Sequence, residues 1–133
     1  MNRLAGFFKY AVVFLHATVG WAYCGALIGV GRSVISLRAA LVIHAVGAPI
    51  GFALVSRYYF RHFPYTTPLQ TATAFLLVVA GLDALLVAPF VEKSFMMFRS
   101  LVGTWIPFAL IFAATYVTGL WTLSHGPRPN RGA

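Results

Sequence analysis

The chain has 133 residues, of which 60% are hydrophobic and 9% charged, and it carries ten lysines and arginines against two acidic residues. A soluble domain has roughly a quarter of its residues charged, so this composition excludes an ordinary soluble fold. The net charge of +8 lies in short loops and tails, which favours anionic lipid headgroups as partners and excludes nucleic acid, because no soluble face could bind it. We therefore expect an all-α integral membrane protein.

Four apolar stretches are each long enough, at about 20 residues, to cross a bilayer as a helix. They nearly exhaust the chain and predict one four-helix transmembrane domain over residues 1–124, with short loops and both termini on the same side. The first stretch is too long for the apolar part of a signal peptide, so we expect it to be retained. The predicted helices span about 8–30, 37–59, 68–90 and 101–123, and a disordered polar tail covers 125–133.

Glycine and proline indicate where the first two helices pack or bend. Gly25 and Gly29 in the first helix, and Gly47 and Gly51 in the second, are each four residues apart, a spacing that lets two helices approach closely. Pro49 lies between the second pair and predicts a kink. We expect close packing at these positions, with a hinge or a broken-helix binding site as the alternative.

The third helix has a clear start signal. Thr67 is expected as the N-cap, Pro68 takes the first helical position, and Gln70 completes a capping box. The segment before it, RYYFRHFPY, is aromatic and basic, a composition typical of a membrane interface. We expect Arg57 and Arg61 to act there as membrane-surface anchors.

Asp83 lies inside the third apolar stretch, and the only other acidic residue, Glu92, lies just past its end. A carboxyl at membrane depth is costly if it is charged and faces lipid. Counting 1.5 Å per residue from each helix centre places His44 of the second helix at the level of Asp83. We expect these two residues to form an intramembrane site for a proton or a cation. The alternative is that Asp83 only joins helices and that His44 is an ordinary buried histidine.

Three further polar residues extend from this level. Tyr23 of the first helix falls at the depth of Asp83, His16 lies on the same helix face in the opposite leaflet, and Thr115 of the fourth helix approaches the depth of His16. We expect a polar track through these residues, with packing and interhelical hydrogen bonds as the alternative. Because His16 and His44 lie in different leaflets, a haem held by both is disfavoured, and we predict no cofactor.

The sequence favours no enzyme. The loops are too short to form an active site outside the membrane, and the chain has no metal-ligand cluster and no serine–histidine–aspartate set at a workable depth. Its single cysteine, Cys24, cannot form an internal disulfide and is expected to be a small buried hydrophobic residue. An enzyme that acts on a lipid inside the bilayer is the remaining catalytic alternative.

Two functional hypotheses follow. The first is a homo-oligomeric channel or secondary transporter for a small ion or solute. The second is a non-catalytic accessory or assembly subunit of a larger membrane complex, including a respiratory or redox complex. Basic residues number six on the side of the termini and four on the other, which predicts cytoplasmic termini in a bacterial inner membrane. A bias this small also allows a dual topology, with antiparallel copies in one dimer.

Overall fold

The computed structural model describes residues 2–125, and most of the predicted disordered tail, residues 126–133, lies outside them. Nearly all of the described chain is helical. Four spans (α1, α2, α3 with η1, and η3 with α4) are long and apolar enough to cross a membrane. In chain order, the elements are α1 (Asn2–Val34), α2 (Leu37–His62), α3 (Pro68–Leu82), the π-helix η1 (Asp83–Glu92), the 3₁₀-helix η2 (Met96–Arg99), the π-helix η3 (Leu101–Trp105) and α4 (Ile106–His125).

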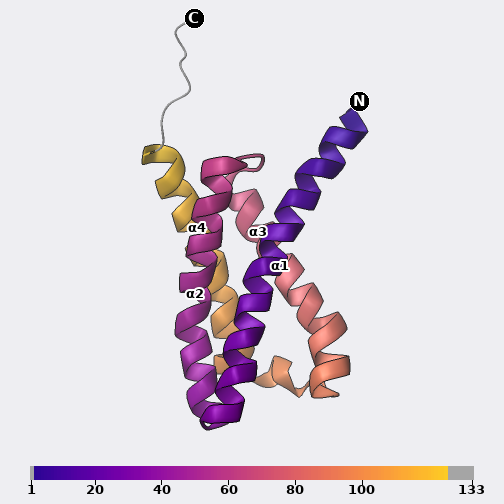
Figure 1. Cartoon of the computed structure of the whole chain (residues 1–133), viewed down its shortest axis with the longest axis vertical. Helices are drawn as coiled ribbons and strands as arrows, with labels where there is room; N and C mark the ends of the chain where they lie inside the picture. Colours follow the sequence, from indigo (N-terminus) through magenta and orange to yellow (C-terminus); the bar gives the residue numbers. More distant parts are fainter. Residues whose placement is uncertain (1, 126–133) are drawn as a thin grey trace, which may run out of the picture.

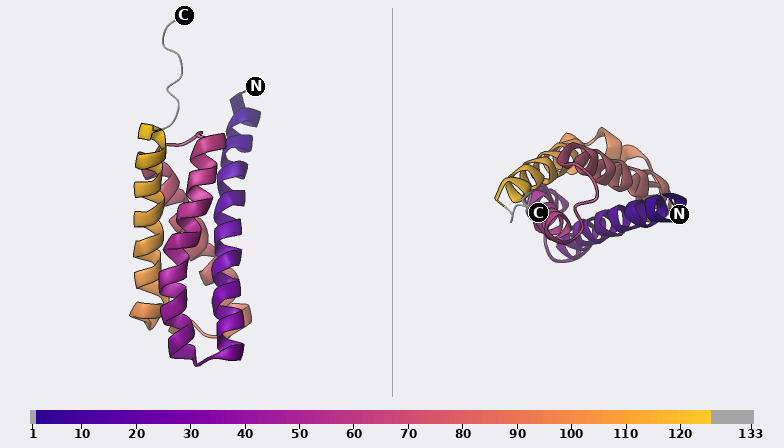
Figure 2. Two further views of the ribbon diagram at one scale, coloured as in Figure 1. Left: turned by 60° about the vertical axis from the view of Figure 1, so that its left-hand side comes forward. Right: turned by 90° about the horizontal axis from the view of Figure 1, so that it is seen from above.

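The four spans form an up-and-down bundle in which α1 begins and α4 ends at the same end (Figure 1). We call this the terminal end. The opposite end, which carries the α1–α2 turn and the η1–η3 connection, is the loop end. Both α1 and α4 pack against α2 and α3, so the helices are arranged in the ring α1–α2–α4–α3 (Figure 2). Among the described residues, no Cα atom of α2 lies within 8 Å of one in α3, and the same holds for α1 and α4.

Capping side chains begin α2 and α3. The Ser36 hydroxyl oxygen accepts a hydrogen bond from the Ala39 backbone N–H over 3.2 Å. The predicted capping box of α3 is confirmed, because the Gln70 backbone N–H donates to Thr67 Oγ1 over 3.2 Å and the Thr67 backbone N–H donates to Gln70 Oε1 over 3.1 Å. Each cap satisfies an N–H group that the first helical turn leaves without a partner.

A chain of buried hydroxyl groups connects α2 to α3 at the terminal end. The Tyr59 hydroxyl lies 2.7 Å from Thr66 Oγ1, which lies 2.6 Å from Thr71 Oγ1. The Thr71 hydroxyl also donates to the Thr67 carbonyl over 2.8 Å. These bonds fix the turn between the two helices, because hydroxyl groups removed from water need partners.

Several predicted helix boundaries are wrong. α1 and α2 extend beyond 8–30 and 37–59, and α2 continues through Pro49 to His62. α4 includes His125, which the sequence reasoning assigned to the tail, because its ring stacks on Trp121 with the centroids 5.0 Å apart. The third helix is not α-helical over 68–90, since it becomes a π-helix at Asp83. Pro89 has no N–H and its ring would clash with the preceding α-helical turn, and a wider turn accommodates it.

Aromatic rings fill the centre of the bundle and span the diagonal between α2 and α3. The Phe52 and Phe75 ring centroids lie 6.0 Å apart, and the Tyr59 ring lies 6.1 Å from Phe75. All three side chains are fully buried. Gly20 of α1 provides the space for Phe52, because a Cβ atom there would lie 2.5 Å from the Phe52 Cζ atom. This aromatic level separates the terminal half of the bundle from the loop half.

Candidate functional site

Asp83 occupies the position at which the third span widens from an α-helix to a π-helix. Its Oδ1 atom accepts a hydrogen bond from Trp21 Nε1 of α1 over 2.9 Å. Asp83 and Trp21 are both half-buried. Cys24 lies three residues after Trp21, hence on the same side of α1, and is 5% exposed. The Asp83 carboxyl therefore faces α1, at the side that carries Trp21 and Cys24.

Glu92 forms a second bridge between the same two elements. It closes η1 with an ion pair to Arg32 of α1, so both acidic residues of the chain join η1 to α1. The α1 and η1 backbones do not approach each other otherwise, since none of their described Cα atoms lie within 8 Å. We call this boundary, with its Trp21–Asp83 and Arg32–Glu92 bridges, the α1–η1 seam.

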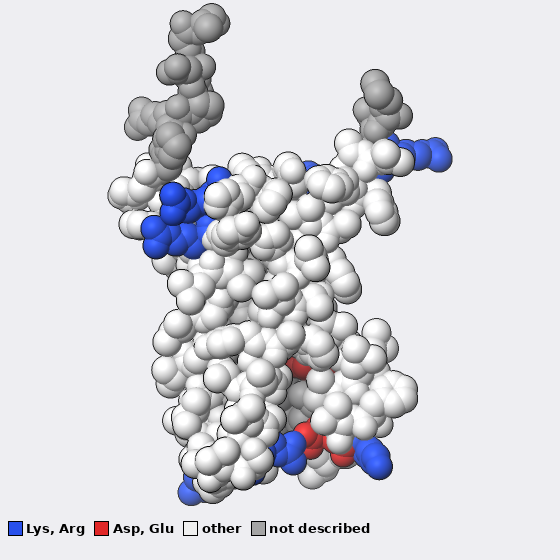
Figure 3. All heavy atoms as spheres, in the orientation of Figure 1, with Lys and Arg blue, Asp and Glu red and all other residues white. Residues whose placement is uncertain are grey.

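The seam coincides with a hollow in the loop half of the molecule. α1 and η1 diverge toward the loop end in the ribbon view (Figure 1). In the space-filling view, acidic atoms lie in and beside a hollow on this face (Figure 3). This hollow therefore lies where both acidic residues of the chain join η1 to α1.

Asp83 and His44 lie at about the same depth. Phe52 and Phe75 are in contact and define a common level. His44 is eight residues from Phe52, and Asp83 is eight residues from Phe75, both toward the loop end. At 1.5 Å per residue, each lies about 12 Å from the aromatic level.

His44 nevertheless has different neighbours from Asp83. It lies one turn from Leu41, which faces Gly103 of η3, and one turn from Gly47, which faces α1. Its side chain is 7% exposed, and its Nδ1 atom has no hydrogen-bond partner among the described residues. No hydrogen bond joins the described His44 and Asp83 side chains: Asp83 is bonded to Trp21, and no described Cα atom of η1 lies within 8 Å of one in α2. Buried polar atoms nearly always have a partner, so Nδ1 can accommodate a water molecule or another bound group.

The π-helix supplies a further polar atom beside Asp83. In the i→i+5 hydrogen-bond pattern of η1, the donor for the Ala84 carbonyl would be the backbone nitrogen of Pro89. Proline has no N–H, so the Ala84 carbonyl oxygen lacks that donor. The Ala84 carbonyl is thus a backbone acceptor without its π-helical donor, one residue along the chain from Asp83.

Tyr23 and His16 lie along the contact between α1 and α2. The Tyr23 ring covers Gly51, and its hydroxyl would lie 3.5 Å from a Cβ atom at Gly47. Two turns closer to the terminal end, the His16 ring stacks on Tyr58 with the centroids 5.9 Å apart. The glycine pair of α2 therefore makes a close helix contact, and the two polar residues of α1 lie against α2.

Thr115 belongs to a separate contact between α2 and α4. Thr115 and Ser56 are both fully buried. Thr115 lies one turn before Gly119 on α4 and Ser56 one turn before Phe60 on α2, and the Phe60 ring packs against Gly119. The hydroxyl oxygens of Thr115 and Ser56 have no hydrogen-bond partner within the described part of the chain. The structure thus places Thr115 on a different interface from His16 and Tyr23.

Gly25 and Gly29 make no close contact within the described chain. A Cβ atom at either position would have nothing within 4 Å, although the spacing predicts a helix contact. They lie on an exposed side of α1, so any partner for this side comes from outside residues 2–125.

Basic residues lie at both ends of the bundle, and none is seen in the band between them on the face shown in Figure 3. Arg57 and Arg61 lie in the last two turns of α2, at the terminal end. The Arg57 guanidinium stands 5.8 Å from the Trp121 ring centroid, a cation–π contact. This distribution is typical of a protein whose two ends reach lipid headgroups.

Sequence reasoning missed Trp21 as the partner of Asp83. The indole N–H is a donor that needs an acceptor when it is buried. Trp21 is the only tryptophan near the middle of the first span, and Asp83 is the only acid inside an apolar stretch. Pairing the isolated donor with the isolated acceptor could have found this contact.

Comparisons of the chain with models of protein families, with curated proteins and with solved structures found no match. Within residues 2–125, no group of three or more histidine, cysteine and acidic residues is arranged to hold a metal ion.

Proposed function

We propose that this chain is an integral membrane protein that transports a proton or another small ion through Asp83, as a homo-oligomeric channel or secondary transporter. One observation carries the proposal. Asp83 is the only carboxyl inside an apolar stretch, it lies at the α1–η1 seam, and its only hydrogen bond among the described residues is to Trp21.

The Asp83 carboxyl can gain and lose a proton without losing its partner. An indole N–H donates to a carboxylate oxygen and also, in a weaker bond, to the carbonyl oxygen of a protonated acid. The Ala84 carbonyl beside Asp83 and the His44 imidazole at the same depth offer further sites for water or for the transported ion. Burial and isolation of an ionisable group at this depth favour a functional role over a purely structural one.

The aromatic level favours a transporter over a continuously open channel. We infer that an ion reaches Asp83 through the hollow from the loop end, whereas Phe52, Phe75 and Tyr59 fill the bundle on the terminal side of Asp83. An ion that reaches Asp83 from the loop end therefore requires a rearrangement of helices or rings before it can leave at the terminal end. Such alternating access is how secondary transporters operate.

The homo-oligomer and the topology are further parts of the proposal. The exposed Gly25–Gly29 side of α1 has the spacing that membrane helices use to pack against one another. A second copy of the chain is the partner that we infer for it. We place the termini in the cytoplasm of a bacterial cell, with the bundle in the inner membrane, because of the excess of basic residues on the terminal side.

The test is proton uptake into liposomes under an imposed membrane potential, with wild type, Asp83→Asn and Arg57→Gln. Arg57→Gln is the control, since it removes a charged side chain at the terminal end, away from the α1–η1 seam. We expect uptake by wild type and by Arg57→Gln, and none by Asp83→Asn at equal amounts of folded protein. Equal uptake by Asp83→Asn and wild type would refute the role of Asp83.

The accessory-subunit hypothesis is supported by a different feature. The N-terminal part of α1 extends beyond the other helices (Figure 1) and exposes Phe7 at 76%, Tyr10 at 66% and Phe8 at 59%. Aromatic side chains are common anchors in protein interfaces. Gentle solubilisation of native membranes tests this function: migration in a much larger particle than an oligomer of this 14.5 kDa chain favours a subunit of a complex.

A further inference from the structure

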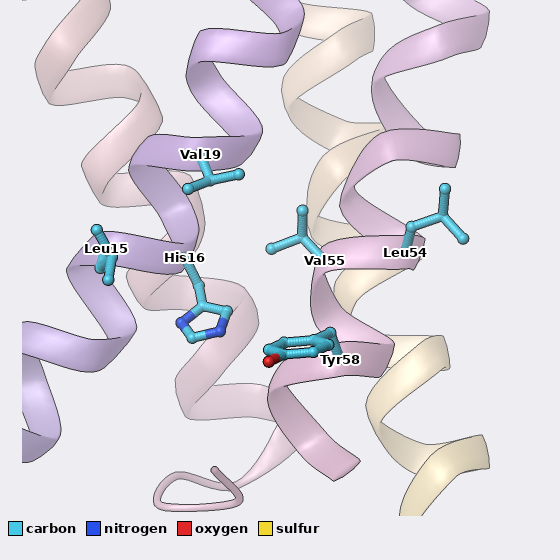
Figure 4. A pocket seen from close by; sticks show the side chains of 6 residues that line it. All are labelled: Leu15, His16, Val19, Leu54, Val55 and Tyr58. Atoms are coloured by element: carbon cyan, nitrogen blue, oxygen red, sulfur yellow. The ribbon is translucent and has the colours of Figure 1, made fainter. Parts of the chain in front are cut away.

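A groove of about 360 Å³ lies between α1 and α2 on the outer surface of the bundle. Three of its side chains are exposed, namely Leu54 at 65%, Leu15 at 60% and Val19 at 54%. The groove is thus open to the surroundings of the bundle and separate from the hollow at Asp83. It is lined by Leu15, His16, Val19, Leu54, Val55 and Tyr58 (Figure 4).

The groove is apolar along its length and has a polar residue near its terminal end. His16 Nδ1 lies 2.8 Å from the Val12 carbonyl oxygen, so Nδ1 must carry the hydrogen of that bond. The other ring nitrogen, Nε2, is left to bind a ligand. In Figure 4, the His16 and Tyr58 rings reach toward each other across the gap between the helices, and the aliphatic side chains lie toward the loop end.

Two basic residues continue the two walls of the groove toward the terminal end. Lys9 is seven residues before His16 on α1, and Arg61 is seven residues after Leu54 on α2. Seven residues are about two turns and about 10.5 Å, so Lys9 lies on the same face of α1 as His16, and Arg61 lies on the same face of α2 as Leu54. Both acidic residues belong to η1 in the loop half, so no described carboxylate neutralises these cations at the terminal end.

We propose that the groove binds one anionic phospholipid from the leaflet on the terminal side. Its acyl chain lies along Val19 and Leu54, its ester region reaches His16, and its phosphate lies at the level of Lys9 and Arg61. The apolar floor excludes a soluble anion, and the two cations favour an anionic lipid over a zwitterionic one. The inference rests on the proposed membrane location but not on transport through Asp83.

The full-length protein in mild detergent, mixed with equal amounts of phosphatidylglycerol and phosphatidylcholine, provides the test. Native mass spectrometry counts the lipids that stay bound. We expect wild type to retain phosphatidylglycerol preferentially. Val19→Trp fills the groove and should lose this lipid, whereas Val117→Trp, at a valine of α4 that is 61% exposed, should retain it.

A second pair of variants distinguishes the contribution of the lipid headgroup to binding from that of the acyl chain. Arg61→Gln should reduce the preference for phosphatidylglycerol about fivefold, the effect of one basic residue near a membrane surface. Arg38→Gln, which removes a cation in the first turn of α2 at the loop end, should leave the preference unchanged. Thermal unfolding midpoints close to the wild-type value show that each variant is folded.

Two results would overturn the proposal. The first is equal retention of phosphatidylglycerol by Val19→Trp and Val117→Trp, which would mean that the lipid binds elsewhere. The second is a neutral isoprenoid, such as a quinone, that stays bound in place of phospholipid and is insensitive to Arg61→Gln. Neither result would change the liposome test of Asp83, so the two proposals fail independently.

Discussion

Cys24 provides a reporter for the α1–η1 seam, because it is the only cysteine, is 5% exposed and shares a side of α1 with Trp21. Trp21→Phe removes the hydrogen bond to Asp83 and keeps an aromatic ring. Glu92→Gln removes the ion pair at the other bridge. We expect each substitution to raise the rate at which a membrane-permeant maleimide alkylates Cys24.

The expected size follows from the two bridges. A net hydrogen bond contributes about 0.5–1.5 kcal/mol. The side chains of the ion pair are 43% and 33% exposed, and such a pair contributes about 0.2–1 kcal/mol. If Cys24 reacts only while the seam is open, the rate of its alkylation is proportional to the fraction of molecules in which the seam is open. Since 1.4 kcal/mol is a factor of ten, Trp21→Phe should accelerate alkylation about fivefold, Glu92→Gln two- to threefold, and both together about tenfold or more.

The assay is the time course of the mass increase after addition of N-ethylmaleimide to the protein in liposomes. Cys24→Ser shows that the label is on this residue, and Arg57→Gln controls for the loss of a polar group far from the seam. The same rate in wild type and in the double variant would refute the reasoning, because the seam would then be held by something other than these two bridges.

Three other substitutions test packing. Gly119→Leu should lower the thermal unfolding midpoint in detergent by several degrees or more, because even a Cβ atom there would lie 2.7 Å from the Phe60 ring and overpacking typically costs about 1–3 kcal/mol. Gly25→Leu places its side chain in open space within its own chain, so the unfolding midpoint should stay near that of wild type. Oligomers trapped by chemical cross-linking should disappear in this variant, and their persistence would contradict the inferred interface. Tyr59→Phe removes a 2.7 Å hydrogen bond to Thr66, which is worth about 1 kcal/mol and should lower the midpoint by a few degrees.

The number of spans and the capping box could be predicted because they depend on local sequence. Apolar length sets how many helices can cross a bilayer, and Thr67 and Gln70 form their bonds within one turn. The common depth of Asp83 and His44 was also within reach, since every α-helix rises by the same amount per residue.

The lateral arrangement could not be predicted in the same way. A depth estimate places Asp83 beside His44, but the ring order of the bundle puts their helices on a diagonal. The direction in which side chains of the third span point could not be predicted either. The π-helix that begins at Asp83 changes the faces on which the following residues lie, and the proline that favours it is six residues later.

The contacts between neighbouring helices differ around the bundle, and this difference supports the proposed access to Asp83 at the seam. Lipid tails are as apolar as helix surfaces, so membrane helices associate through close packing and polar bonds. α1 packs closely on α2, because Gly51 and Gly47 admit the Tyr23 side chain. Along η1 this close packing is replaced by the two bridges that involve acidic residues.

Proton binding at Asp83 should therefore be coupled to opening of the seam. A charged carboxylate accepts a stronger hydrogen bond from Trp21 than a neutral acid does, so protonation weakens one of the two bridges. Reciprocity then requires an open seam to favour the protonated acid. If Asp83 is charged in the closed protein, Asp83→Asn, a neutral group that still accepts a hydrogen bond, should alkylate at Cys24 faster than wild type and more slowly than Trp21→Phe. A rate equal to that of wild type would show that the bridge does not sense the charge of Asp83, and would separate ion binding from movement of the seam.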